Sequence, residues 1–271
     1  MTKNWLITGA SRGLGRAWAE AALKRGDKVA ATARNIDDLQ ELANQYGDSL
    51  LPIILDVTDR HSVFESMKTA FAHFGNIDVV VSNAGYALFG TIEESSELES
   101  RAQFDANFFG TLWVVQAALP YLRQQGGGHI LATSSLAGVI TFPTAGIYNA
   151  SKWAVEGLLQ TLNSEVNSFG IKVTLIEPGG YATDWRGPSS TLTTPMSEYD
   201  ELRTMIKTAS VGRKLGDPSA TASAILSVVD TAEPPLRLFL GNGNLDLAHK
   251  EYAGRLATWE AWAEVSRAAQ E

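Results

Sequence analysis

The first third of the chain alternates short apolar runs with amphipathic segments, and this alternation restricts the fold more than any other feature. The apolar runs have the length of strands and cover residues 5–8, 28–33, 50–55 and 77–82. Between them lie segments with helical periodicity, at 17–23, 37–46 and 59–74, and a glycine follows each one. This order with short connections is typical of a doubly wound parallel sheet with right-handed crossovers. The sequence therefore predicts a three-layer α/β/α fold.

The rest of the chain continues the pattern with longer helices. Further helices are expected at 98–124, 149–168, 218–229 and 244–267, and further strands at 129–133, 171–176 and 236–240. Residues 181–216 break the rhythm and are rich in Thr, Ser, Pro and Gly. A long insert in a compact domain is usually a functional lid, so we predict a substrate lid there. Without an internal repeat or linker, we expect a single domain over 1–271.

Composition excludes several classes of function. The chain has 22 basic and 30 acidic residues and a net charge of −8, which gives no electrostatic footprint for nucleic acid or anionic lipid. It has no cysteine, and its four histidines are not spaced as ligand pairs, so we expect no metal site. No apolar run approaches the roughly 20 residues of a membrane span, and the N-terminus lacks the features of a signal peptide. We expect a cytoplasmic protein with no nucleic-acid or membrane partner.

A glycine-rich turn separates the first predicted strand from the first helix. Its candidate cofactor-binding residues are Gly9, Ser11, Arg12, Gly13, Leu14 and Gly15. Glycines there allow a tight turn and a close approach of backbone N–H groups to a pyrophosphate, which the helix dipole also favours. The spacing is GxxxGxG rather than the common GxGxxG, and a purely structural turn is the alternative. The position directly after the first strand of a βαβ unit favours nucleotide binding.

The end of the second strand indicates which nucleotide. An acidic residue there would bind the ribose 2′-hydroxyl of NAD, whereas an arginine accommodates the 2′-phosphate of NADP. This chain has Arg34 at that point, and Arg12 is a second candidate for the same phosphate. We therefore expect NADP(H) in preference to NAD(H), with a solvated surface Arg34 as the alternative. The other strand ends contribute further candidates, namely Asp56 and Val57 beside the adenine, and Asn83, Ala84 and Gly85 after the fourth strand.

Ser135, Tyr148 and Lys152 have the character of a proton-transfer site. Ser135 lies thirteen residues before Tyr148, and Lys152 lies four residues after it. On a helix, positions i and i+4 share a face, so the phenol and the ammonium would point the same way. A nearby cation favours the phenolate and lowers the pKa of the phenol towards the working pH of an acid–base catalyst. The alternative is an amphipathic helix that carries a Tyr and a Lys by chance.

Together, these motifs resemble the short-chain dehydrogenase/reductase family over essentially the whole chain. The motifs occur in the order and spacing of that family: Thr8 to Gly15, Asn83-Ala84-Gly85, Asn107, Ser135, Tyr148-x-x-x-Lys152 and Pro178-Gly179. The resemblance implies a Rossmann fold and a short, single-domain, NADP-dependent enzyme. The C-terminal part, from Pro234 to the Trp-bearing last helix, resembles the 17β-hydroxysteroid-dehydrogenase-like branch.

The resemblance also implies roles for individual residues. Tyr148 would be the general acid or base, Lys152 would lower its pKa and bind the nicotinamide ribose, and Ser135 would hold the substrate oxygen. Asn107 would position a water molecule next to Lys152, or else simply bond to backbone within its helix. Thr183 would bind the nicotinamide carboxamide after Pro178 and Gly179, or else be an ordinary loop residue.

The predicted walls of the substrate site are mostly apolar. They comprise Tyr86, Phe89, Leu136, Ala137, Phe142, Tyr181, Trp185 and Met196. Such walls suit an apolar carbonyl or alcohol substrate, and packing within the lid is the alternative for each aromatic residue. The helices at 98–124 and 149–168 are apolar on more than one face, so we expect a homodimer or homotetramer formed through them. A non-catalytic NADP-binding sensor or scaffold, and an epimerase or dehydratase, are the competing functions.

Overall fold

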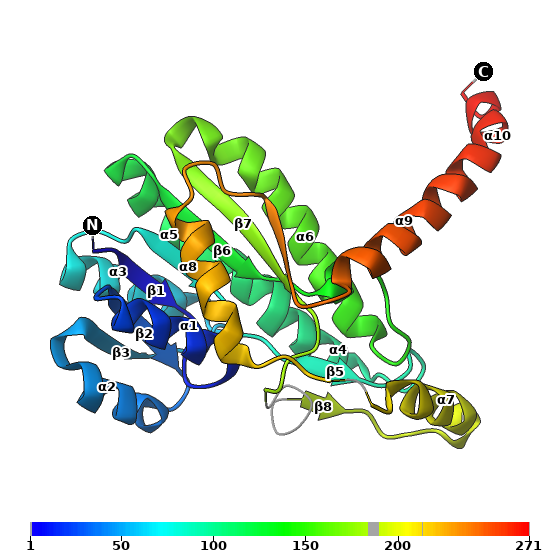
Figure 1. The fold of residues 1–271 in the computed structure, drawn as a ribbon, viewed down its shortest axis with the longest axis horizontal. Helices are drawn as coiled ribbons and strands as arrows, with labels where there is room; N and C mark the ends of the chain where they lie inside the picture. The colour runs from blue at the N-terminus through cyan, green and yellow to red at the C-terminus, as the bar shows by residue number, and fades with distance from the viewer. Residues whose placement is uncertain (1, 184–189, 213, 271) are drawn as a thin grey trace.

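The computed structural model describes residues 2–183, 190–212 and 214–270, and these form a three-layer α/β/α fold around a parallel sheet (Figure 1). The described part of the sheet has seven strands in the order β3-β2-β1-β4-β6-β7-β9. The strands are β1 Asn4–Ile7, β2 Lys28–Ala33, β3 Leu50–Ile54, β4 Val79–Ser82, β6 Gly128–Thr133, β7 Ile171–Pro178 and β9 Arg237–Leu240. The doubly wound parallel sheet predicted from the sequence is confirmed. Its strand order reverses beside β1, where β2 lies on one side and β4 on the other.

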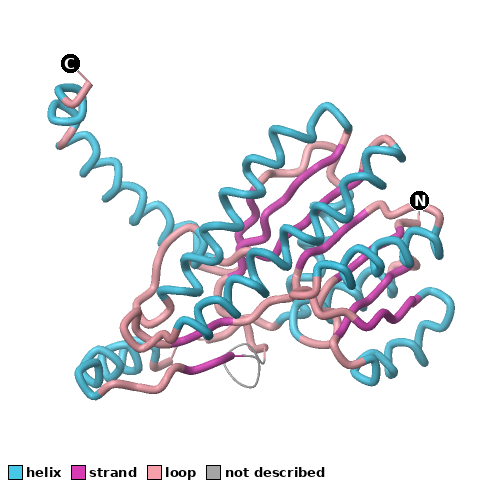
Figure 2. Tube along the Cα trace, turned by 180° about the vertical axis from the view of Figure 1, so that it is seen from behind, coloured by secondary structure: helices cyan, strands magenta, loops and turns pink. Residues whose placement is uncertain are grey.

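Helices cover both faces of the sheet, as Figure 2 shows from behind. One apolar core joins α3, α5 and α6 to the sheet, and a second joins α1, α2 and α8 to the opposite face. These helices are α1 Gly13–Lys24, α2 Gln40–Tyr46, α3 Arg60–Phe74, α5 Gly110–Gln125, α6 Gly146–Val166 and α8 Ala222–Asp230. Because both faces are covered, the central strands are continuous apolar runs rather than alternating ones, and Val79, Val80 and Val81 are all at most 1 % exposed.

The helix predicted at 98–124 is interrupted. The structure has α4 at Glu97–Phe104, a π-helical turn at Asp105–Phe109, and then α5. Ser96 caps α4 through a capping box with Glu99, which explains why the helix begins there. The π-helical turn contains Asn107, whose side chain bonds to groups outside its own helix. Hydrophobic periodicity cannot reveal this turn, because a single wide turn leaves the apolar pattern nearly unchanged.

The predicted lid at 181–216 contains regular structure. Strand β8 at Ser190–Leu192 pairs in parallel with β5 at Ala87–Phe89, and helix α7 follows at Asp200–Ser210. Glu94 attaches this segment to the body, because its carboxylate accepts the Met196 amide at 2.7 Å and also contacts Arg203. Residues 184–189 and 213 of the predicted lid, and with them Trp185, lie outside the described residues.

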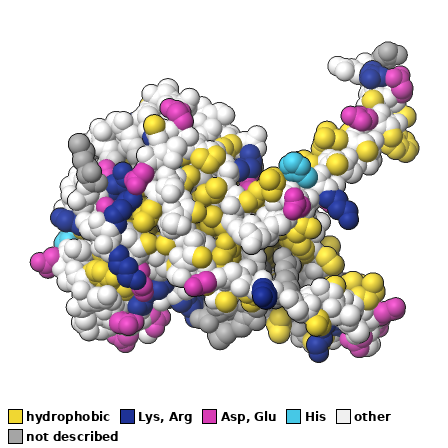
Figure 3. Space-filling view, in the orientation of Figure 1, with side chains coloured by type: hydrophobic (Ala, Val, Ile, Leu, Met, Phe, Trp, Pro, Cys, Tyr) yellow, Lys and Arg dark blue, Asp and Glu magenta, His cyan; other side chains and the backbone are white. Residues whose placement is uncertain are grey.

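The C-terminal helix predicted at 244–267 is α9 at Asn244–Ala261 followed by α10 at Ala263–Ala268. Its first turns pack on the body, where the Arg255 guanidinium lies 4.7 Å from the centroid of the Trp153 ring. Beyond that point the arm projects away from the body (Figure 1), and apolar side chains follow its length in the space-filling view (Figure 3). Trp259 is 61 % exposed and Trp262 is 62 % exposed.

Candidate active site

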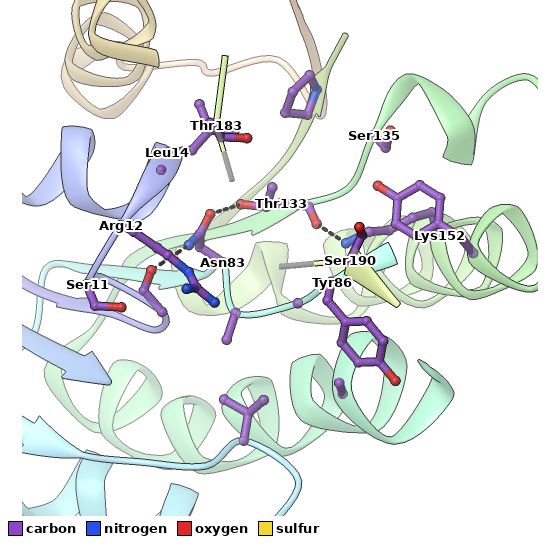
Figure 4. A pocket seen from close by; sticks show the side chains of 18 of the residues that line it. Ser11, Arg12, Leu14, Asn83, Tyr86, Thr133, Ser135, Lys152, Thr183 and Ser190 are labelled. Carbon is purple, nitrogen blue, oxygen red and sulfur yellow. Dashed lines mark hydrogen bonds between the residues drawn. The ribbon is translucent and has the colours of Figure 1, made fainter. Parts of the chain in front are cut away.

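A cleft of about 660 Å³ lies at the carboxyl ends of the parallel strands (Figure 4). In a doubly wound sheet, this edge, next to the reversal of strand order, is where ligands bind. All but two of the predicted catalytic and cofactor-binding residues line the cleft, and the exceptions are Gly15 and Asn107. Those that line it are Gly9, Ser11, Arg12, Gly13, Leu14, Arg34, Asp56, Val57, Asn83, Ala84, Gly85, Ser135, Tyr148, Lys152, Pro178, Gly179 and Thr183.

The glycine turn leads from β1 into the N-terminus of α1 at one end of the cleft. Gly9 and Gly13 have φ values of +66° and +58°, a backbone conformation that favours glycine. Gly15 lies behind the turn, where a Cβ atom would be 2.4 Å from both Gly9 O and Asn83 Nδ2. Helix α1 begins at Gly13, and the Arg12 side chain does not cap it. The turn thus brings a helix N-terminus to the cleft, which is an arrangement suited to a pyrophosphate.

Asn83 joins the glycine turn to the centre of the sheet. Its Nδ2 donates to Thr8 O and Gly9 O, each at 3.1 Å, and its Oδ1 accepts from Thr133 Oγ1 at 3.2 Å. The Thr133 carbonyl in turn accepts from Lys152 Nζ at 2.8 Å. Thr133 was not among the residues predicted from sequence, although its position at the carboxyl end of a parallel strand was a usable signal.

The end of β2 carries the predicted cofactor-selecting cation. Arg34 follows the last residue of β2, and both it and Arg12 line the same cleft. Asp56, after β3, also lines the cleft, and its carboxylate accepts the Thr58 amide at 2.9 Å and the Thr58 hydroxyl at 2.8 Å. The Asp56 carboxylate is therefore already engaged by hydrogen bonds within its own turn.

Tyr148 and Lys152 lie on the first two turns of α6, which begins at Gly146, and are only 4 % and 6 % exposed. Ser135 begins the short 3₁₀ turn Leu136–Gly138. Burial raises the pKa of Tyr148, and its hydrogen bond with the Ser135 side chain acts in the opposite direction. Burial also lowers the pKa of Lys152 to about 8.

The lowering of the Tyr148 pKa by Lys152 stays a prediction, because in this structure burial acts on the phenol in the opposite direction. The Lys152 Nζ lies 5.9 Å from the centroid of the Tyr148 ring and donates to a backbone carbonyl, while burial dominates the Tyr148 pKa. The shared helix face was predicted correctly, but the low-dielectric surroundings of that face were not considered. The sequence does not show how deeply a helix face is buried.

Asn107 is fully buried and does not line the cleft. Its Oδ1 accepts from the Tyr86 amide at 3.1 Å, and its Nδ2 donates to Tyr86 O at 3.0 Å and to Ser151 Oγ at 3.1 Å. It thus holds the segment after β4 against α6. A Cβ atom on Gly85 would lie 2.8 Å from Asn107 Oδ1 and 3.8 Å from Lys152 Nζ, so only glycine separates these two side chains.

The predicted apolar walls fall into separate groups. Tyr86 and Tyr181 line the cleft. Phe89, Ala137 and Phe142 instead pack around Tyr148, and Leu136 lies in a neighbouring core cluster. Met196 does not line the described cleft. Sequence reasoning missed several polar lining residues, namely Thr58, Asp105, Ser134, Ser190 and Thr191. Asp105 belongs to the π-helical turn and Ser190 to β8, and neither element was predicted.

A metal site needs a cluster of ligating side chains, and a membrane span needs a long apolar helix. Within 2–183, 190–212 and 214–270, no three His, Asp or Glu side chains come together as a set of metal ligands. Over the same residues, no helix combines the length and apolar character needed to cross a membrane.

Both the sequence and the fold are similar to those of known oxidoreductases. Residues 3–193 match the family described as short chain dehydrogenase. The chain is 44 % identical over 272 residues to the oxidoreductase BOA17 of Botryotinia fuckeliana, with 99 % of each chain covered. A short-chain dehydrogenase structure from Streptomyces avermitilis is 37 % identical, covers 99 % of each chain and gives a TM-score of 0.92. An alcohol dehydrogenase from Thermococcus sibiricus, complexed with 5-hydroxy-NADP, is 29 % identical with a TM-score of 0.73, covering 89 % of this chain and 96 % of its own.

The fold, the cleft and these similarities define a dinucleotide-type α/β oxidoreductase. More particularly, the chain belongs to the short-chain dehydrogenase/reductase family.

Proposed function

We propose that this protein is an NADP(H)-dependent oxidoreductase that transfers a hydride between the nicotinamide and a carbonyl or secondary alcohol of a mainly apolar substrate. The observation that carries this proposal is that Ser135, Tyr148 and Lys152 line one cleft with the glycine turn. The bound cofactor supplies or accepts the hydride, and the protein provides orientation and proton transfer. Tyr148 gives its phenolic proton to the carbonyl oxygen in reduction, and Ser135 Oγ holds that oxygen.

Burial of Tyr148 supports the donor role. A buried phenol with a raised pKa keeps its proton at neutral pH, and that proton is what carbonyl reduction consumes. Lys152 lies on the same helix face and is fixed by the Thr133 carbonyl, so its ammonium is held at the floor of the cleft. There it can bind the ribose of the nicotinamide. Pro178 ends β7, Gly179 and Thr183 follow it, and all three line the cleft, so we propose that they contact the nicotinamide.

The preference for NADP(H) rests on two arginines, one in the glycine turn and one directly after β2. Arg12 and Arg34 both line the cleft, and Arg34 occupies the position after β2 at which NAD-binding proteins carry an acidic residue. A guanidinium can donate two parallel hydrogen bonds to the oxygens of a charged phosphate. Its hydrogen bond to a neutral ribose hydroxyl is weaker. The Thermococcus sibiricus relative, complexed with an NADP derivative, is consistent with this assignment.

Substitution of Tyr148 by Phe tests the catalytic role. Removing a general acid typically costs about 10²–10⁴-fold in turnover, so we expect a loss of that size in kcat/KM. NADPH affinity, measured by fluorescence titration, should stay within about threefold because the ring and its packing are kept. Tyr252→Phe, on α9 and outside the cleft, is the matched control and should retain full activity. A Tyr148→Phe enzyme with near wild-type turnover would remove this residue from the proton transfer.

Arg34→Asp tests the cofactor. We expect the ratio of kcat/KM for NADPH to that for NADH to fall at least about tenfold, because a carboxylate repels the 2′-phosphate and accepts from a ribose hydroxyl. Arg267→Asp makes the same charge change on the exposed arm and should leave the ratio unchanged. An unchanged ratio for Arg34→Asp would place the 2′-phosphate elsewhere.

We also propose a homodimer or homotetramer formed through the helices of 98–124 and 149–168. On this surface Phe109 is 37 % exposed and stacks on Trp113 at 5.6 Å between ring centroids. Light scattering coupled to size-exclusion chromatography gives the mass directly, and a monomeric mass at micromolar concentration would contradict the proposal.

A further inference from the structure

Two buried glutamates lie directly behind the cleft, on the elements that carry its proposed catalytic residues. Glu156 follows Lys152 by one turn of α6 and is 6 % exposed. Glu177 lies in β7, immediately before Pro178, and is fully buried. Carboxyl groups are almost never buried this completely unless they are paired, so the arrangement calls for a physical explanation.

The two carboxyl groups contact each other and share one cation. Arg237 Nε, on β9, donates to Glu156 Oε2 at 2.9 Å and lies 3.5 Å from Glu177 Oε1. Within the described part of the chain, no N–H or O–H group of another residue donates to either oxygen of Glu177. The side chains of Glu156 and Glu177 nevertheless lie within hydrogen-bonding reach of each other. A proton on one of the two carboxyl groups would supply the missing donor.

Charge balance leads to the same conclusion. Two ionised carboxylates against one guanidinium would leave an uncompensated negative charge in the interior, which is strongly unfavourable. Burial and, after it, the negative charge of Glu156 raise the pKa of Glu177 to about 8. Burial likewise raises the pKa of Glu156, and the Ser134 hydroxyl and Arg237 oppose that rise. Two carboxyl groups this close cannot both ionise readily, so they hold one proton between them.

The pair also touches the segments that form the cleft. A Cβ atom on Gly138 would lie 2.6 Å from Ser134 Oγ and 3.0 Å from Glu156 Cγ, so the turn that begins at Ser135 packs directly on Glu156. Arg237 extends the cluster outwards to Gln160, whose Oε1 accepts from its NH2 group at 2.8 Å. The groups that face the pair are thus Lys152 and Gln160 from α6, Ser134 from the loop after β6, and Arg237 from β9.

We propose that Glu156 and Glu177 share a single proton, with Glu177 donating to Glu156, and that this carboxyl pair positions Lys152 and the Ser134–Ser135 turn behind the cleft. Only the significance of Lys152 and Ser135 rests on the proposed function; the shared proton does not. With one proton retained, the pair and Arg237 are neutral together. When that proton is lost at alkaline pH, a second negative charge forms on Glu177, next to Glu156, which lies one turn from Lys152 on α6.

The sign of the pH effect follows from the raised pKa. A carboxyl group that holds its proton more tightly in the folded state stabilises that state at low pH, and this contribution is lost as pH rises through the folded pKa. Glu177→Gln keeps a neutral hydrogen-bond donor at this position and cannot ionise. The variant should therefore lack the alkaline loss of stability, while Glu165→Gln, at an exposed position on the same helix, should behave as wild type.

Infrared spectroscopy with ¹³C-labelled glutamate tests the shared proton without any substrate. Wild-type protein at about pH 7 should show the carbonyl band of a protonated carboxylic acid, and this band should disappear as the pH is raised to about 10. Glu165→Gln should retain the band. Either Glu177→Gln or Glu156→Gln should lose it, because a lone carboxyl group beside Arg237 ionises. Absence of the band from wild-type protein would overturn the proposal, whatever the variants do.

Melting temperatures and kinetics test the positioning role. Between about pH 7 and about pH 9.5, the wild-type melting temperature should fall by about 4 °C more than that of Glu177→Gln. With any substrate that is turned over, Glu177→Gln should displace the alkaline limb of kcat by about half a pH unit or more while NADPH affinity is kept. A purely structural pair would give equal kcat profiles and contradict the positioning role. An inactive wild type that still shows the band would contradict the proposed function alone.

Discussion

Substitution of Gly15 by Ala is a sharp test of the structure around the glycine turn. The residue lies in the first turn of α1, does not line the cleft, and permits no side chain. An added Cβ atom would sit 2.4 Å from Gly9 O and 2.4 Å from Asn83 Nδ2, about 1 Å inside ordinary contact. Either the helix must move outwards or the Gly9 carbonyl must turn away, so the two ends of the turn cannot both keep their places.

The magnitude follows from these contacts. Overpacking a well-packed site by one methyl group costs about 1–3 kcal/mol. Displacing the Gly9 carbonyl also breaks its 3.1 Å hydrogen bond with Asn83 Nδ2, which adds about 1 kcal/mol. The free energy of unfolding should therefore fall by about 2–4 kcal/mol. In a chain of this length, that corresponds to a drop of about 5–10 °C in melting temperature.

Gly157→Ala is the matched control, because it makes the same chemical change within α6. A Cβ atom on Gly157 meets nothing within 4 Å, so alanine should stabilise the protein by about 0.5–1 kcal/mol through its higher helix propensity. Urea denaturation gives both free energies, and NADPH titration should show at least about tenfold weaker binding for Gly15→Ala only, since the pyrophosphate turn is displaced. If Gly15→Ala is as stable as Gly157→Ala and binds NADPH equally well, the close packing described for this turn is refuted.

Two further expectations concern the body and the lid attachment. Trp18→Phe removes the indole hydrogen bond to Thr221 Oγ1 at 2.8 Å inside the core, so urea denaturation should show a loss of about 2–3 kcal/mol, against less than about 0.5 for the exposed Trp259→Phe. The Met196 and Thr91 amides, which bond to the Glu94 carboxylate, lower its pKa to about 2, so this carboxylate stabilises the fold above about pH 4.5 and the contribution is lost as pH falls towards 2. Glu94→Gln should accordingly melt below wild type at pH 7, and scanning calorimetry should show the difference narrowing over that acidic range; a constant difference would contradict the assignment.

Local patterns in the sequence predicted the sheet and the glycine turn because each is determined over a few residues. A strand buried on both faces reads as an apolar run, and the helix that follows a glycine turn has its own periodicity. The carboxyl ends of parallel strands necessarily meet at one edge, so the order of strands along the chain is enough to place Gly9, Arg34 and Asn83 together. The cleft contains all three.

Features that depend on distant contacts were not predictable in this way. The π-helical turn at Asp105–Phe109 is accompanied by bonds from Asn107 to Tyr86 and Ser151, which come from other parts of the chain. The sequence of the projecting arm is that of an ordinary amphipathic helix. Only the structure shows that Trp259 and Trp262 are exposed rather than packed against the rest of the protein. The buried carboxyl pair joins Glu156 to Glu177 across two elements, and neither residue belongs to a recognisable local motif.

The electrostatics of the cleft follow from burial acting in opposite directions on its two titratable side chains. Burial favours the neutral form of each group, so it raises the pKa of Tyr148 and lowers that of Lys152 to about 8. In the proposed reaction only the second effect works against catalysis at neutral pH, because a neutral amine could not stabilise a phenolate during alcohol oxidation. The negative charge of Glu156 opposes it by raising the pKa of Lys152. That opposition requires Glu156 to be ionised, and the shared-proton arrangement leaves it so, because Glu177 keeps the proton while Arg237 lies nearer to Glu156. Two carboxyl groups with one proton therefore supply a single negative charge that favours the protonated form of Lys152, while the pair and Arg237 stay neutral together.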